Sequence, residues 1–273
     1  MHALTINLWI YAGVCAATWI LSVITREFSW VDRIWSLVPL AYMAVYAGAA
    51  GFADARLDVM LAVVVIWGAR LTFNFARKGG YAKGGEDYRW AVLRSRVTGW
   101  RWHLFNLFFI VAYQNAILWL ISAPGYTALA HRGHFGVLDV VAAVVFLGCT
   151  LGETVADQQQ WDFHQWKKAE TDAGRQPSPR FLQTGLFCYS RHPNFFFEQA
   201  QWWVVFAFGA IAAGSVLQPT IVGAVLLVLL FVGSTRFTES ISKSKYPEYA
   251  EYQATTSAII PWPPKHEPAA ETA

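Results

Sequence analysis

Charged residues are scarce in this sequence. Asp, Glu, Lys and Arg make up 14% of its 273 residues, whereas about a quarter is usual in a soluble domain. Hydrophobic residues reach 55%, and the mean hydropathy is +0.32. Water would force these apolar side chains into an oversized core, whereas a bilayer solvates them. The composition therefore argues against a soluble globule and predicts an integral membrane protein.

Cysteine is also rare. There are three cysteines, an odd number, and two of them lie within apolar segments. This pattern excludes a disulfide framework. The formal net charge of +3 is too small to indicate a nucleic-acid partner. His131 and His134 fall in a loop where we expect them to be solvated, so no metal site is predicted.

Apolar segments of the length that crosses a bilayer, about 20 residues, recur along the chain. They cover 6–24, 34–53, 57–76, 102–122, 137–156, 195–213 and 216–235. The sequence therefore predicts an all-α, polytopic membrane protein with seven transmembrane helices, forming a single domain over 1–260. The first segment lacks the flanks of a signal peptide and is expected to be a retained helix. The Pro-rich tail, 261–273, is expected to be disordered.

The basic residues are distributed unevenly between the two sides of such a membrane domain. With seven spans, 18 of the 21 Lys and Arg residues fall on the same side, and Arg56 and Arg132 are alone on the other. Basic loops stay in the cytoplasm. This distribution predicts an N-terminus outside and a C-terminus in the cytoplasm.

Polar side chains enter the apolar segments near their predicted cytoplasmic ends. Several repeat at helical spacing, which places them on one helix face. They are Arg70, Asn74 and Arg77; Glu153 and Asp157; Asn194, Glu198 and Gln201; and Arg236 and Glu239. One interpretation is a polar cavity open to the cytosol. The alternative is a set of snorkelling charges and interhelical ion pairs that fix the topology.

The densest motif is GLFCYSRHPNFFFE over 185–198. Pro193 suits the first turn of a helix, and Arg191 and His192 precede that turn. The free amides and the dipole of a helix N-terminus attract phosphate. The motif is therefore interpreted as an anion-binding helix entry, or alternatively as a basic anchor at the membrane interface.

At this motif the chain resembles the C-terminal domain of the membrane steroid 5α-reductases, and more closely the bacterial branch of that superfamily. Segments 67–71, 86–89, 153–160 and 246–249 add to the likeness. It covers most of 32–261, with the reductase-like C-terminal part at about 137–261. The resemblance implies a bacterial inner-membrane enzyme whose cofactor site faces the cytoplasm. Such an enzyme uses NADPH to saturate a C=C bond conjugated to a carbonyl in a steroid- or isoprenoid-like substrate.

The resemblance also implies roles for individual residues. Asp157, Tyr189, Asn194 and Glu198 match positions that hold the cofactor. The further candidates for cofactor binding are His164, Arg180, Arg191, His192, Arg236 and Glu239.

For catalysis, Asp32 falls where the reductases have an acidic residue that contacts the substrate carbonyl. Asn74 stands where the animal enzymes have their catalytic tyrosine. Tyr88, or Tyr81, could replace that phenol if the glycine-rich loop over 79–85 folded as a lid. That loop matches no phosphate-binding fingerprint, so we otherwise expect a flexible connector. Hydride addition to an enone requires a donor at the carbonyl oxygen, and a protonated Asp32 could serve.

Two other functions fit part of the pattern. Integral-membrane methyltransferases of the isoprenylcysteine and phospholipid type share the Arg-His-Pro helix entry and bind S-adenosylmethionine beneath it. They usually carry a pair of glutamates near the last span, where this chain has Glu239. A non-catalytic transporter or scaffold is the second alternative, although no internal repeat is visible. The expected partners are membrane lipids and a lipophilic small-molecule substrate.

Overall fold

The structure is a computed structural model that describes residues 2–265, and all regular secondary structure within those residues is helical. The all-α prediction is confirmed. The helices of the first half are α1 (Ala3–Thr25), α2 (Trp30–Ile34), α3 (Val38–Ala49), α4 (Ala55–Arg77), α5 (Tyr88–Arg96), α6 (Trp100–Phe105), a π-helix (Asn106–Tyr113), α7 (Gln114–Ser122) and α8 (Pro124–Ala130). They are followed by α9 (Val137–Asp172), a 3₁₀ helix (Gly185–Cys188), α10 (Pro193–Ala213), α11 (Ile221–Lys245) and α12 (Tyr249–Thr255).

Five helical segments have the length and hydropathy to cross a membrane. They are Ala3–Thr25, Ala55–Arg77, Trp100–Ala130, Val137–Asp172 and Ile221–Lys245. These segments are compatible with an integral membrane protein. Seven spans are therefore not confirmed, and the orientation of the termini stays a prediction.

The two other expected spans correspond to α3 and α10. A turn at 35–37 separates α2 from α3, and Pro39 lies in the first turn of α3. Its 12 residues reach about 18 Å, which is short of a hydrocarbon core of about 30 Å. The expected span over 34–53 is therefore corrected to a short helix. The 21-residue α10 is long enough, but the Asn, Glu and Gln residues of its first half lower its hydropathy, and it is not among these five segments.

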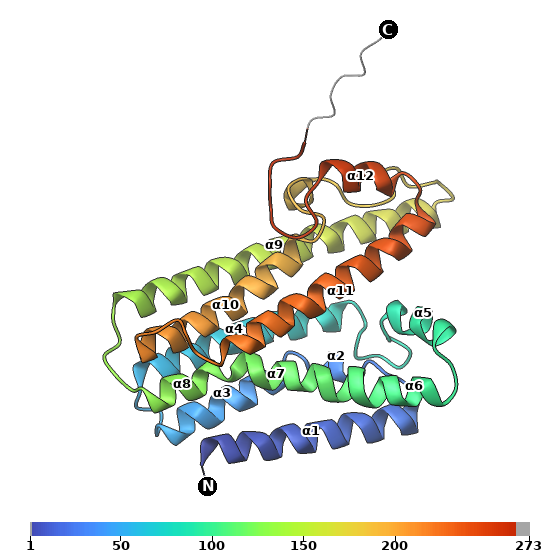
Figure 1. Cartoon of the computed structure of the whole chain (residues 1–273). Coiled ribbons are helices and arrows are strands. Elements are labelled where there is room, and N and C mark those ends of the chain that lie inside the picture. The colour runs from blue at the N-terminus through green and yellow to red at the C-terminus, as the bar shows by residue number, and fades with distance from the viewer. Residues whose placement is uncertain (1, 266–273) are drawn as a thin grey trace. The chain divides into compact units, whose positions relative to one another are not determined.

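The chain divides into two compact units. The first unit comprises Met1–Leu147 with Trp202–Leu227, and the second comprises Gly148–Gln201 with Val228–Ala273. In the first unit α3 packs against α1, α4, α7 and α8 (Figure 1). A Cβ at Gly68 of α4 would lie 2.5 Å from a Leu40 methyl, so glycine permits the close approach of α4 to α3. The boundary of a single domain at residue 260 stays a prediction.

The second unit contains the ends of the two longest helices. α9 continues to Asp172 and α11 to Lys245, past the expected ends at 156 and 235. The expected ends were placed where the apolar segments give way to polar residues. The helices continue beyond these points because Gln, Glu and Lys also favour the helical conformation. Figure 1 shows α12 beyond the C-terminal end of α11.

The start of the predicted disordered tail is ordered. The Trp262 amide donates to the Tyr189 carbonyl, and the Lys265 amide donates to the Thr255 carbonyl, each over 2.9 Å. The expected disorder is therefore corrected for 261–265, because these backbone hydrogen bonds fasten the segment to the second unit. The rest of that tail, 266–273, lies outside the described residues.

Candidate functional site

The entry to α10 is built by the predicted Arg-His-Pro sequence. Pro193 is the first residue of the helix, where its missing amide proton costs no helical hydrogen bond. The Ser190 hydroxyl accepts from the His192 amide over 3.2 Å and donates to the Ile259 carbonyl over 2.7 Å. The Arg191 amide donates to the Ser257 carbonyl over 2.8 Å. The segment after α12 is thereby fastened to the entry of α10.

The Glu239 carboxylate of α11 lies at the centre of a polar network at this entry. Arg191 donates from Nε to Oε1 over 2.6 Å and from Nη2 to Oε2 over 3.0 Å. His192 Nε2 lies 3.1 Å from Oε1, and Gln253 Nε2 donates to Oε2 over 2.8 Å. We call Arg191, His192, Glu239 and Gln253 the Glu239 network.

Arg191 and Glu239 form a buried ion pair, since each side chain is 9% exposed. The remaining guanidinium nitrogen, Nη1, donates to the carbonyls of Gln253 and Thr256. These bonds leave the guanidinium little capacity for a cofactor phosphate. We therefore assign Arg191 and Glu239 a positioning role, in which they hold α12 against the start of α10. The His192 ring stacks on Phe195 with centroids 5.1 Å apart.

A second buried polar group joins α9 to α10. Gln201 Nε2 donates to Glu153 Oε2 over 2.7 Å, and the Thr150 hydroxyl donates to Gln201 Oε1 over 2.7 Å. A Cβ at Gly152 would lie 2.5 Å from the Phe197 ring, so the two helices approach closely here. Glu153 and Gln201 were among the residues predicted to line a polar cavity. In the structure these two side chains bond to each other and join α9 to α10.

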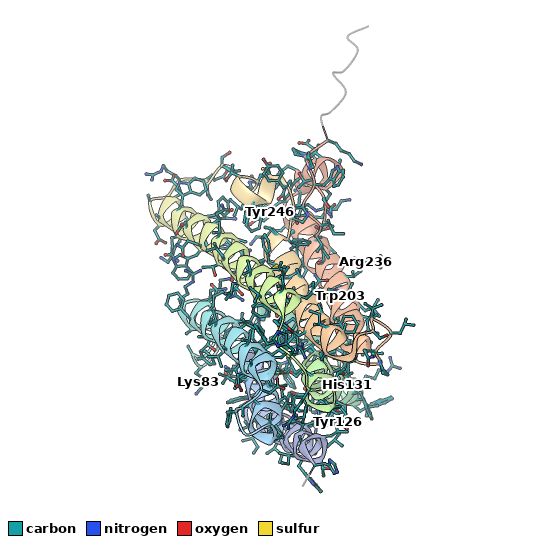
Figure 2. The ribbon with its side chains drawn as sticks, turned by 90° about the vertical axis from the view of Figure 1, so that its left-hand side faces the viewer. Lys83, Tyr126, His131, Trp203, Arg236 and Tyr246 are labelled. Carbon is teal, nitrogen blue, oxygen red and sulfur yellow. The ribbon has the colours of Figure 1, made fainter. Side chains whose placement is uncertain are left out.

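The other predicted cofactor residues of the second unit differ in exposure. Asp157 and Glu198 are buried, and Asn194 is partly buried in the first turn of α10. His164, Arg180, Tyr189 and Arg236 are exposed; Figure 2 labels Arg236 on α11. All of these candidates belong to the second unit.

A polar groove of about 880 Å³ opens in the second unit. Arg180 and Lys265 supply its basic groups, and Glu248 and Glu251 its acidic groups. Arg180 Nε lies 3.6 Å from Glu248, and both side chains are largely exposed. The remaining lining residues are Ser178, Pro179, Phe181, Gln183, Tyr252, Thr255 and Pro264.

Beside Arg180 is a lysine–tyrosine pair that sequence reasoning missed. Lys167 Nζ donates to the Tyr246 hydroxyl over 3.0 Å and to the Arg180 carbonyl over 2.5 Å. Lys245 Nζ lies 5.4 Å from the centroid of the Tyr246 ring. Partial burial acts to raise the pKa of Tyr246, but the bonds from Lys167 and Lys245 outweigh it and lower the pKa below its usual value. The Tyr-Pro-Glu-Tyr segment, which resembles the reductase family, drew attention to Tyr246. Nothing in the local sequence indicated that its partner would be Lys167, 79 residues away.

A glycine shapes the approach to the Arg-His-Pro segment. Gly185 has φ +65°, and a Cβ there would lie 2.5 Å from Gln159 Oε1. That same oxygen accepts the Leu186 amide over 2.9 Å. The position therefore requires glycine for both its backbone conformation and its contact with α9.

We expect Gly185→Ala to lower the free energy of unfolding by about 2–3 kcal/mol, because backbone strain and a clash add. Gly174→Ala is the matched control. It has φ +74° but open space around a Cβ, so strain alone costs about 1 kcal/mol. Thermal unfolding of the detergent-purified protein measures both. Equal losses in the two variants would contradict the clash with Gln159.

In the first unit, α2 presents Asp32 to Trp90 of α5. Trp90 Nε1 donates to Asp32 Oδ2 over 2.9 Å. Trp90 packs in an apolar cluster with Phe28, Val31 and Trp102, and the expected neighbour Trp35 packs at its edge. Desolvation raises the pKa of Asp32 to about 6, against the opposing effects of the Trp90 hydrogen bond and Arg89. The direction agrees with the raised pKa expected for this carboxyl.

The two other catalytic candidates lie on different helices of the first unit. Asn74 is buried on α4 and accepts from Arg77 Nε over 2.9 Å. Tyr88 begins α5 and its side chain is exposed. Tyr81, the alternative phenol, packs edge-on against Phe75 with centroids 5.0 Å apart.

The glycine-rich loop is fastened rather than free. Arg33 donates from Nε to the Gly80 carbonyl over 3.1 Å and from Nη2 to the Ala82 carbonyl over 3.3 Å. Glu27 accepts the Gly84 amide over 2.9 Å. The expected flexible connector is therefore corrected: charged side chains from the α1–α2 junction satisfy its backbone groups. These partners are about 50 residues away, which no local pattern reveals.

Comparison with known proteins identifies relatives across both units. A family described as "Protein of unknown function (DUF1295)" matches residues 18–256. An uncharacterised protein of the fission yeast Schizosaccharomyces pombe is 39% identical over 259 residues, which is 89% of this chain and 75% of the relative. No solved structure matches the chain. Neither match carries a reductase name, and the yeast relative is not bacterial.

Proposed function

The chain belongs to the DUF1295 family, and we propose that it is an NADPH-dependent membrane reductase that saturates a C=C bond conjugated to a carbonyl. The substrate is a lipophilic molecule of steroid or isoprenoid type. The single observation that carries the proposal is the Glu239 network, which fixes a phosphate-attracting helix entry beneath the segment after α12.

The residues at this entry suit a dinucleotide. The first-turn amides and dipole of α10 favour a phosphate, and Asn194 lies in that turn. The amide of Asn194 and the carboxylate of Glu198 would hold the carboxamide and ribose hydroxyls. His192, whose Nε2 contacts Glu239 in the Glu239 network, lies just before the same helix turn.

The polar groove suits the phosphates at the other end of the cofactor. Arg180 and Lys265 line the groove. Lys167 lies next to it, because its Nζ donates a hydrogen bond to the Arg180 carbonyl. The exposed pair between Arg180 and Glu248 is of a kind that contributes about 0–1 kcal/mol, so Arg180 can exchange its partner for a phosphate. A guanidinium binds phosphate through two parallel hydrogen bonds.

Asp32 of the first unit has the chemistry of the proton donor that the reaction needs. When bound, NADPH supplies the hydride that adds to the β carbon of the enone. The protonated Asp32 carboxyl would transfer its proton to the carbonyl oxygen as enolate charge develops there. The resulting enol would tautomerise to the saturated ketone, taking a proton at the α carbon from water and releasing the one on oxygen. The raised pKa of Asp32 keeps a useful fraction of this acid protonated near neutral pH.

Binding of NADPH to the purified protein tests the proposal. We expect Asn194→Ala and Glu198→Ala each to weaken binding about 10- to 100-fold, because each removes a hydrogen bond to the cofactor. Ser240→Ala, at an exposed position of α11, is the control and should bind as the wild type does. Unchanged affinity in both site variants would defeat the assignment.

The same titration with S-adenosylmethionine separates the reductase from a methyltransferase, which shares the Arg-His-Pro entry. The reductase proposal predicts no measurable affinity for S-adenosylmethionine. Substrate-dependent consumption of NADPH then distinguishes an enzyme from a transporter or scaffold.

A further inference from the structure

Helix α1 turns its polar side chains inward. Its buried residues are Ala3, Asn7, Thr18 and Ser22, although the helix as a whole is strongly apolar. Ser22 accepts from Asn106 Nδ2 over 2.8 Å, and Thr18 accepts from Asn115 Nδ2 over 3.3 Å. Such hydrogen bonds join helices within a bilayer, where water is absent. Along this part of α1, each inward polar side chain meets a partner from the π-helix or α7.

Near the start of α1, three buried side chains bring unpaired polar atoms together. Asn7 Nδ2 donates to the Tyr42 carbonyl over 3.2 Å, but Asn7 Oδ1 and the hydroxyls of Tyr42 and Tyr46 have no partner among the described residues. Asn7 lies near the Tyr46 hydroxyl, but the pair does not meet the geometry of a hydrogen bond. All three side chains are fully buried. We call Asn7, Tyr42 and Tyr46 the Asn7 cluster.

The unpaired atoms of the Asn7 cluster define the group that would complete them. Asn7 Oδ1 accepts a hydrogen bond, and each phenol donates one. A single hydroxyl group donates to an amide oxygen and accepts from a phenol at once, whereas a carbonyl only accepts. None of the three residues is charged, so the cluster is suited to a neutral ligand.

The surroundings of the Asn7 cluster suit a ligand with an apolar body. Tyr11 of α1, which lies near Tyr42, packs against Trp119 of α7 with ring centroids 6.1 Å apart. Tyr46 contacts Tyr126 at 6.2 Å between centroids, and Tyr126 of α8, labelled in Figure 2, is 37% exposed. Only 11% of the apolar window of α1 is buried, so most of this helix is left for contact with lipid.

We propose that the Asn7 cluster binds the hydroxyl group of a lipophilic alcohol that enters from the bilayer between α1 and α3. The site is separate from the proposed cofactor residues, and the inference does not depend on the reductase activity. It assigns a ligand to polar atoms that would otherwise remain unpaired in an apolar environment, where each is costly.

The test uses the full chain in lipid nanodiscs with a diazirine-bearing analogue of farnesol. A matched probe carries a methyl ether in place of the hydroxyl. We expect the alcohol to label the peptides that contain Asn7 or Tyr42–Tyr46, and unlabelled farnesol to compete. The ether should label them about tenfold less, because it cannot donate to Asn7 Oδ1.

Tyr42→Phe and Tyr46→Phe keep the rings and remove one hydroxyl each. We expect labelling by the alcohol to fall at least about fivefold in each variant. The midpoint of thermal unfolding should not fall, because the deleted hydroxyl has no partner to lose. Tyr249→Phe, in α12 of the second unit, is the control and should label as the wild type does. Equal labelling by alcohol and ether, or unchanged labelling in both cluster variants, overturns the proposal and leaves water as the occupant.

Discussion

Replacing Glu239 with alanine is expected to lower the free energy of unfolding by about 3–5 kcal/mol and to abolish NADPH binding. The stability loss follows because Arg191 would remain buried as an uncompensated charge. The binding loss follows because Arg191, His192 and Gln253 all bond to the deleted carboxylate. Thermal unfolding and NADPH titration of the same preparation measure the two effects.

Two further variants separate folding from binding. Glu248→Ala removes an exposed pair with Arg180 and should cost less than about 1 kcal/mol. The double variant Arg191→Met, Glu239→Leu replaces the buried pair with apolar groups, which is often neutral or stabilising. We expect it to recover stability without recovering NADPH affinity. Wild-type affinity in this folded double variant would show that the Glu239 network does not position the cofactor site.

Asp32→Asn is expected to reduce turnover by about 100-fold or more, with little change in NADPH affinity. The amide keeps the shape of the carboxyl but loses the acidic proton, and general acids contribute about 10²–10⁴ to rates. NADPH consumption with a panel of 4-en-3-one steroids and isoprenoid enones measures it. Asp162→Asn, at an exposed site on α9, is the control. A fully active Asp32→Asn enzyme would remove this residue from the mechanism.

The dependence of the rate on pH also tests the role of Asp32 as the acid. Burial raises the pKa of Asp32 to about 6, and only the protonated form donates. The rate should therefore be highest below pH 6 and decline as the pH rises through that value. Trp90 donates to the carboxylate and so favours ionisation. Trp90→Phe should move the decline to higher pH, whereas a shift to lower pH would contradict the assigned hydrogen bond.

Local pattern was sufficient for the helices that carry an uninterrupted apolar segment. The expected segments 6–24 and 57–76 lie within α1 (Ala3–Thr25) and α4 (Ala55–Arg77). Length and hydropathy decide these elements because a helix that crosses a bilayer must be long and apolar. The same reasoning failed for α3, where hydropathy continues through a turn at 35–37 that shortens the helix.

The sites depend on contacts that local pattern does not contain. The Arg-His-Pro motif predicted that Arg191 precedes a helix, but its partner Glu239 is 48 residues away. Asp32 was expected in an apolar setting, yet its partner Trp90 is 58 residues away. Polar residues in a membrane segment predict that partners exist. Which partner each one meets depends on the packing of distant helices.

The most direct test of the reductase proposal is mass spectrometry of the small molecules released from gently purified protein. The account predicts NADPH or its oxidised form at close to one molecule per chain, and much less of either from Asn194→Ala. Release of S-adenosylmethionine or its demethylated product, with no pyridine nucleotide bound even after addition of NADPH, would contradict it.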